Sequence, residues 1–269
     1  MTDYSEQTVD CGESKINYAA WPGDGPPLLL IHGLSGRWQS WLNVVPLLKP
    51  RWRISALDLR GHGKSGHAVS GYPLQGYAAD VEKFIEAVFS GPVNVIGHSL
   101  GAMTAMVLAA TAPSLVRSAV LEDPPIYVYR RPQTGQRFLL THEMASSRMT
   151  VDEIAQRILL ERPENTPEQA NMTAQSWRAL DPKTVGGVID RTNIWGDAIE
   201  DDMRRIKCPT LLLQANPELG GAMSDADGDR AAAVIPNCTL VRWPDTGHGM
   251  HGAKPAEFVA AAECHLKGS

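Results

Sequence analysis

Short apolar runs alternate with helix-like segments along the first half of this 269-residue chain. The apolar runs are typical of buried strands in a parallel sheet, and they lie at residues 28–31, 54–59, 93–96 and 118–122. Segments with apolar residues at helical spacing lie between them, at residues 38–48, 74–89 and directly after residue 99. Alternation of this kind predicts an α/β fold, with a mostly parallel central sheet and helices on both faces. Residues 14–21, where apolar and polar positions alternate, are expected to add an edge strand.

The pattern changes in the middle of the chain. Residues 125–206 contain no convincing strand, and within them residues 151–161 and 168–180 favour amphipathic helices. Strand-like and helical segments return later, at residues 210–213, 225–235, 239–243 and 255–266. We therefore predict a core made of residues 1–124 and 207–269, with residues 125–206 inserted as a helical cap. Such a cap would cover the carboxyl edge of the sheet, where ligands bind in folds of this kind.

Composition and charge exclude several classes of function. Hydrophobic residues make up 43% of the chain and charged residues 20%, values that suit a globular domain with a real core. The net charge of −5 comes without any run of Lys and Arg longer than a pair, so no nucleic acid and no anionic membrane is expected as a partner. No stretch approaches the roughly 18 apolar residues that a membrane span needs.

The start of the chain and its cysteines predict a cytoplasmic location. Residues 1–15 are polar and acidic, and they lack the apolar core of a secretory signal. The four cysteines are scattered and form no C-x-x-C pair; they are Cys11, Cys208, Cys238 and Cys264. We expect them to be free thiols in a reducing compartment.

A serine stands where the strand at 93–96 turns abruptly into a helix. The stretch is Gly97-His98-Ser99-Leu100-Gly101. One interpretation is a helix N-cap, because a serine hydroxyl can accept a hydrogen bond from the first free amides of a helix. The other is a nucleophile elbow, in which the serine takes a strained conformation and the flanking glycines avoid collisions with the neighbouring strand and helix.

Four stretches, in this order and spacing, make the chain resemble the α/β-hydrolase superfamily over nearly its whole length. They are residues 31–34 (IHGL), 58–65 (DLRGHGKS), 97–101 (GHSLG) and 246–249 (TGHG). The resemblance implies the α/β-hydrolase fold with a helical cap insertion. It also implies that Ser99 is a nucleophile, with its hydroxyl above the carboxyl edge of the sheet.

The resemblance assigns the groups that work with Ser99. A serine hydroxyl needs a base within hydrogen-bond reach, and His248, which follows the last predicted strand, matches the position of that base; His251 is expected to be a neighbour. The backbone N–H groups of Leu34 and Leu100 match the oxyanion hole, which stabilises the charge of a tetrahedral intermediate.

The acid that orients the base is where the sequence departs from most of the family. Asn216 stands where an aspartate is usual, and an asparagine cannot balance the charge of an imidazolium. Some relatives place the acid after the strand that follows the nucleophile helix, and here Asp123 holds that position. Because Pro124 follows it, Asp123 is expected to have an extended backbone. Our hypothesis is that Asp123 is the acid. Two alternatives stay open: that Asp123 only caps the turn that follows it, and that Glu218 is the acid. Asn216 is expected nearby as a hydrogen-bonding partner.

A serine nucleophile indicates acyl transfer to water, and therefore hydrolysis of a carboxylic ester or lactone. The cap residues Tyr127, Met144 and Trp177 are candidates for a pocket that takes a medium-sized apolar substrate, with a core role as the alternative; Trp195 is a further cap aromatic. No metal-ligand spacing and no Gly-rich phosphate motif appears, so neither a metal nor a cofactor is predicted. The expected partner is the small-molecule substrate, and the chain is expected to be a monomer or homodimer.

Three other functions remain open at this level. A carbon–carbon bond hydrolase and a cofactor-free perhydrolase can use the same three side chains. A ligand receptor with the same fold would need no turnover at all.

Overall fold

A computed structural model describes residues 3–69, 71–131, 133–193, 196 and 198–267. Within them the strands form one eight-stranded sheet with the order β1-β2-β4-β3-β5-β6-β7-β8. The strands are β1 (Ser5–Asp10), β2 (Lys15–Trp21), β3 (Pro27–Ile31), β4 (Arg53–Leu57), β5 (Val93–His98), β6 (Val116–Glu122), β7 (Thr210–Ala215) and β8 (Cys238–Trp243). From β4 to β8 every neighbouring pair is parallel, whereas β1 and β2 are antiparallel to their neighbours. The predicted α/β fold with a mostly parallel sheet is confirmed.

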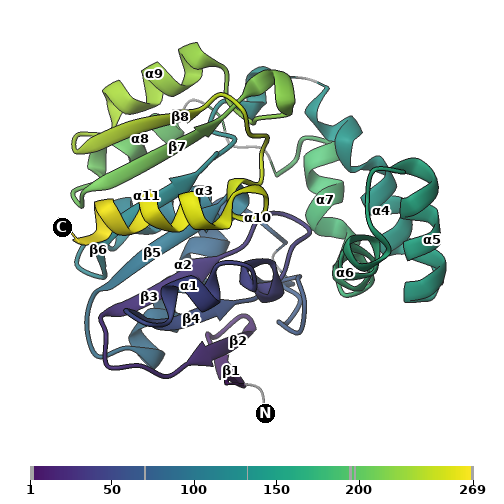
Figure 1. Ribbon diagram of the computed structural model, residues 1–269, viewed down its shortest axis with the longest axis horizontal. Coiled ribbons are helices and arrows are strands. Elements are labelled where there is room, and N and C mark those ends of the chain that lie inside the picture. The colour runs from purple at the N-terminus through teal and green to yellow at the C-terminus, as the bar shows by residue number, and fades with distance from the viewer. Residues whose placement is uncertain (1–2, 70, 132, 194–195, 197, 268–269) are drawn as a thin grey trace.

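Helices cover both faces of the sheet (Figure 1). One face carries α2 (Leu74–Val88), α3 (Leu100–Thr111), α8 (Ile199–Arg205) and α9 (Asp225–Val234), and the other carries α1 (Val45–Leu48), α10 (Met250–Ala253) and α11 (Pro255–Lys267). Successive side chains of a strand point to opposite faces. Strand β3 shows this directly, because Leu29 packs into the first core and both Leu28 and Leu30 pack into the second.

The cap consists of α4 (Leu139–Ser146), α5 (Val151–Glu161), α6 (Pro167–Arg178) and α7 (Pro182–Ile189), which stand to one side of the sheet in Figure 1. The structure describes no strand between β6 and β7. The bounds 125–206 of the cap stay a prediction. Near the two ends of that segment, Tyr127 and the α8 residues Ile199 and Met203 pack into the same core as α2 and α3.

Two local predictions were wrong. The helix expected over residues 38–48 is a 3₁₀ turn, η1 (Trp38–Trp41), followed by the separate short helix α1. Pro46 lies in the first turn of α1 and has no N–H, so it cannot continue a helix that began at Trp38. Strand β1 was not predicted, because its residues are almost all exposed and polar and carry no apolar pattern.

No described helix is both long enough and apolar enough to cross a membrane. All four cysteines are free thiols.

Two fully buried histidines fix the loops at the carboxyl edge of the sheet. His32 Nδ1 lies 2.7 Å from the carbonyl oxygen of Gly33, and its Nε2 accepts a hydrogen bond from the Leu59 N–H at 3.0 Å. His62 Nδ1 lies 2.9 Å from the Arg60 carbonyl oxygen, and its Nε2 accepts from the Ser35 N–H at 3.2 Å. Each imidazole therefore needs its neutral form, with the proton on Nδ1. Burial lowers the pKa of His32 to about 4 and, together with the nearby His32, that of His62 to about 3.

We expect the free energy of unfolding to decrease as the pH falls from about 6.5 towards 4, because the unfolded chain protonates these two imidazoles there and the folded chain does not. Each imidazole contributes a slope of up to about 1.4 kcal/mol per pH unit. Urea unfolding at a series of pH values measures this dependence. A free energy of unfolding that is constant or rises as the pH drops from about 6.5 to 5 contradicts the account.

Candidate active site

Ser99 forms a sharp turn between β5 and α3. Its φ of 52° and ψ of −115° are unusual for a residue with a side chain. The turn is possible because glycines flank it: a Cβ on Gly97 would come within 2.4 Å of the Gly101 carbonyl oxygen, and one on Gly101 would come within 2.1 Å of the Ile31 carbonyl oxygen. The hydroxyl of Ser99 makes no capping hydrogen bond to α3. The helix-cap interpretation therefore has no support in the geometry.

Asp123 lies directly after β6 and is hydrogen-bonded to His248. Its Oδ2 lies 2.6 Å from His248 Nδ1, and the carboxylate is fully buried. Two backbone amides also donate to it, Ala215 N–H to Oδ1 at 3.2 Å and Ala222 N–H to Oδ2 at 2.7 Å. The expectation of an extended backbone was wrong, since Asp123 has a φ of 43°. This turn lets the carboxylate point back over the end of β7 and towards the loop after β8.

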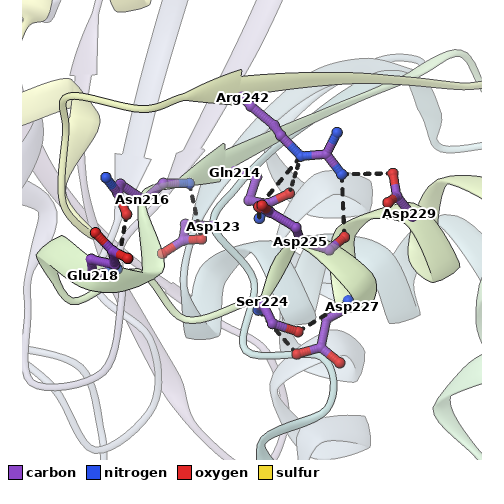
Figure 2. A network of polar contacts seen from close by, with 10 residues as sticks. Asp123, Gln214, Asn216, Glu218, Ser224, Asp225, Asp227, Asp229 and Arg242 are labelled. Carbon is purple, nitrogen blue, oxygen red and sulfur yellow. Dashed lines mark hydrogen bonds and ion pairs between the residues drawn. The ribbon is translucent and has the colours of Figure 1, made fainter.

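Glu218, the alternative acid, and Asn216 lie in the turn after β7, beside Asp123 (Figure 2). Asn216 Oδ1 accepts a hydrogen bond from the Glu218 N–H at 2.8 Å, and its Nδ2 donates to the Pro244 carbonyl oxygen at 2.5 Å. Asn216 therefore holds the turn together, and Glu218 is exposed on it. Within the described residues neither side chain hydrogen-bonds to His248, so the structure does not bring Glu218 to the base.

A second acid and two more histidines surround His248, and sequence reasoning gave them no role. Glu122 is fully buried and accepts hydrogen bonds from the backbone N–H of His251 at 2.9 Å and from its Nδ1 at 2.8 Å. His98 Nε2 donates to the His248 carbonyl oxygen at 3.0 Å. Burial opposes ionisation of Glu122, but the interactions with His251 and His98 and the hydrogen bonds from His251 outweigh it and lower the pKa of Glu122. The charged Glu122 within an apolar strand was the available signal.

The predicted oxyanion donors border the same cavity as Ser99. Leu100 is the first residue of α3, where a backbone N–H has no partner within the helix and the helix dipole favours negative charge. Leu34 lies in the loop after β3. The loop is fixed by the bond from Ser35 N–H to His62 and by the Trp38 N–H, which donates to Asp58 Oδ1 at 2.7 Å. The motif at residues 58–65 thus positions the loop that carries Leu34.

The cavity lies between the core and the cap and has a volume of about 670 Å³. Ser99 and His248 border it from the core, and Phe138, Met172 and Trp177 border it from the cap. Among the described residues no group of three or more His, Cys, Asp or Glu side chains could hold a metal ion.

Of the three predicted substrate contacts, one borders the cavity and two do not. Trp177 borders the cavity, but Tyr127 and Met144 do not. The Tyr127 hydroxyl donates to Glu200 Oε1 at 3.0 Å, which turns the ring into the core. Met144 is buried among the cap helices, where it packs in one cluster with Ile154, Ile158 and Trp177. Trp195 lies outside the described residues.

An elbow serine, an Asp–His pair and two candidate oxyanion amides at the carboxyl edge of a parallel sheet define a hydrolase of the α/β class. A family model described as the alpha/beta hydrolase fold matches residues 26–255. The chain therefore belongs to the α/β-hydrolase family.

Relatives of the chain include hydrolases of varied kinds. The chain is 28% identical over 222 residues to (E)-2-((N-methylformamido)methylene)succinate hydrolase of Acinetobacter baylyi, covering 77% of this chain and 78% of that protein. It is 26% identical over 245 residues to a pimeloyl-acyl-carrier-protein methyl ester esterase of Nitrosomonas europaea, covering 88% and 94% respectively. Among solved structures, an N-formylmaleamic acid deformylase from Pseudomonas putida shares the fold with a TM-score of 0.83 at 23% identity, covering 96% of this chain and all of that one.

We expect Asp123→Asn to lower kcat for ester hydrolysis by about 10⁴-fold, the effect of the same change in a serine protease, because the neutral amide cannot stabilise the imidazolium form of His248. Steady-state kinetics on purified variants of matched circular dichroism measure the effect. Glu218→Gln and Asn216→Ala are the matched controls, and both should lose far less. If Glu218→Gln abolishes turnover while Asp123→Asn retains it, the acid is Glu218.

Proposed function

We propose that the protein is a serine hydrolase that cleaves a carboxylic ester or lactone through an acyl-enzyme on Ser99. The observation that carries the proposal is the bond between Asp123 and His248 Nδ1, together with the position of His248 at the same cavity as Ser99, whose hydroxyl makes no capping bond. This bond keeps the Nδ1 proton in place and leaves Nε2 of His248 free to accept a proton.

The reaction proceeds in two halves. In the first, Ser99 Oγ attacks the substrate carbonyl and His248 Nε2 takes the hydroxyl proton, while the N–H groups of Leu34 and Leu100 stabilise the oxyanion. The bond between the carbonyl carbon and the ester oxygen then breaks, and His248 gives the proton to that oxygen as the alcohol leaves. In the second half, water attacks the acyl-enzyme with His248 again as the base. The bond between the acyl carbon and Ser99 Oγ then breaks, His248 returns the proton to that oxygen, and the acid product leaves.

The surroundings of His248 support this cycle. The imidazolium that forms in each half lies against the buried Asp123 carboxylate, which offsets its charge. The His98 ring holds the backbone of His248, and Glu122 holds His251 one turn further on. A base held from three sides loses little freedom when the substrate binds.

We expect a fluorophosphonate probe to add one adduct to the intact protein, because the probe mimics the tetrahedral intermediate at an activated serine. Intact-mass spectrometry measures the adduct, and Ser99→Ala should remain unmodified. Hydrolysis of p-nitrophenyl butyrate should fall by at least about 10³-fold in Ser99→Ala and in His248→Ala.

An adduct that persists on Ser99→Ala, or a His248→Ala variant with the wild-type rate, contradicts the mechanism. A protein that takes up the probe but hydrolyses no ester or lactone, and instead cleaves a carbon–carbon bond in a vinylogous diketone, contradicts the proposed substrate class alone.

A further inference from the structure

The cavity above Ser99 is lined by cations. Four arginines border it, from the core loop after β3 and from the cap segments around it, and they are Arg37, Arg131, Arg137 and Arg162. No Asp or Glu is among its described lining residues. The chain as a whole has a net charge of −5, so this concentration of positive charge is local to the cavity.

One of the four guanidinium groups is already neutralised, because Arg131 forms an ion pair with Asp227 at 2.8 Å. The other three have no carboxylate partner in the part of the chain that the structure describes. Arg37 donates to the neutral amide oxygen of Gln175 at 2.5 Å, and the Arg162 guanidinium lies 5.5 Å from the centre of the Trp177 ring. Arg137 is exposed at the 3₁₀ helix η3 (Thr134–Phe138).

Arg37 and Arg162 both border the cavity, and both contact α6. Arg37 comes from the loop after β3 and contacts Gln175, whereas Arg162 follows α5 and contacts Trp177. The cavity therefore has two positive charges without a carboxylate ion-pair partner among the described residues, one from the core and one from the cap.

These charges are costly unless a ligand balances them. Burial lowers the pKa of Arg37, although the nearby carboxylates of Asp58 and Glu6 oppose that effect. A wholly apolar substrate would remove still more water from both guanidinium groups and would offer them no hydrogen-bond acceptor in its place. A carboxylate would accept two parallel hydrogen bonds from an arginine and would gain most where water is excluded.

We propose that the cavity selects substrates with a carboxylate on the acyl chain, bound by Arg162 and Arg37. The inference rests on the proposed function, since it names the substrate class of the same site. The proposal replaces the apolar substrate expected from the sequence with an amphipathic one, whose apolar chain lies along Phe138, Met172 and Trp177 and whose anionic end lies at the two arginines.

The test compares two esters with the same leaving group and acyl length, p-nitrophenyl hexanoate and mono-p-nitrophenyl adipate. We expect kcat/KM to favour the adipate ester by about tenfold or more, and we expect added salt to reduce this preference by screening. Arg162→Gln and Arg37→Gln should each lower the ratio of the two kcat/KM values by about tenfold. The matched control is Arg117→Gln, an exposed residue at the start of β6, which should keep the ratio.

Equal or lower kcat/KM for the adipate ester in the wild type overturns the proposal, as does a ratio that survives both arginine substitutions. A second measurement does not depend on turnover: calorimetry should detect adipate binding to Ser99→Ala and a loss of that binding when Arg162→Gln is added. If neither ester is hydrolysed but adipate still binds in this way, the proposed hydrolysis is wrong and the anion site is supported. If adipate does not bind to Ser99→Ala, the anion site is wrong.

Discussion

The hydrogen bond between Asp123 and His248 connects three segments that are far apart in the sequence. Asp123 follows β6, its two amide donors are the last residue of β7 and a residue in the turn beyond it, and His248 follows β8. A carboxylate without any exposed surface is stable only when hydrogen bonds replace its lost water, and here two backbone amides and an imidazole do so. The same bonds fix the turn after β7 and the loop after β8, so the geometry of the base depends on one buried charge.

Glu122 and Asp123 are consecutive acids that hold consecutive parts of one loop. Asp123 binds His248, and Glu122 binds both the backbone and the ring of His251. Successive side chains of a strand point to opposite faces of the sheet, and the backbone turns at Asp123. The two carboxylates therefore reach the loop after β8 from different sides. His98 adds a third restraint from the nucleophile elbow itself. The loop that carries the base is thus held by side chains at the ends of β5 and β6.

Much of this could be predicted from the sequence, and the exceptions have physical causes. The strands of the sheet interior were predictable because segments such as residues 28–31 present apolar side chains to both faces of the sheet. The elbow was predictable from its glycines. The positive φ of Asp123 was not, since Pro124 alone favours an extended residue. Tyr127 and Met144 are as apolar as pocket residues, and only tertiary packing decides that they are buried elsewhere. The pairing of Arg37 with the end of α6 depends on how the cap sits over the core, which no local pattern encodes.

The central claim is that Asp123 holds the proton on His248 Nδ1. Proton NMR on protein labelled with nitrogen-15 in histidine tests it directly, because a proton shared between an imidazole and a buried carboxylate is strongly deshielded. The account predicts such a resonance, correlated with His248 Nδ1, that is lost in Asp123→Ala and kept in Asn216→Ala. A resonance that persists in Asp123→Ala, or that disappears in Asn216→Ala, would contradict it.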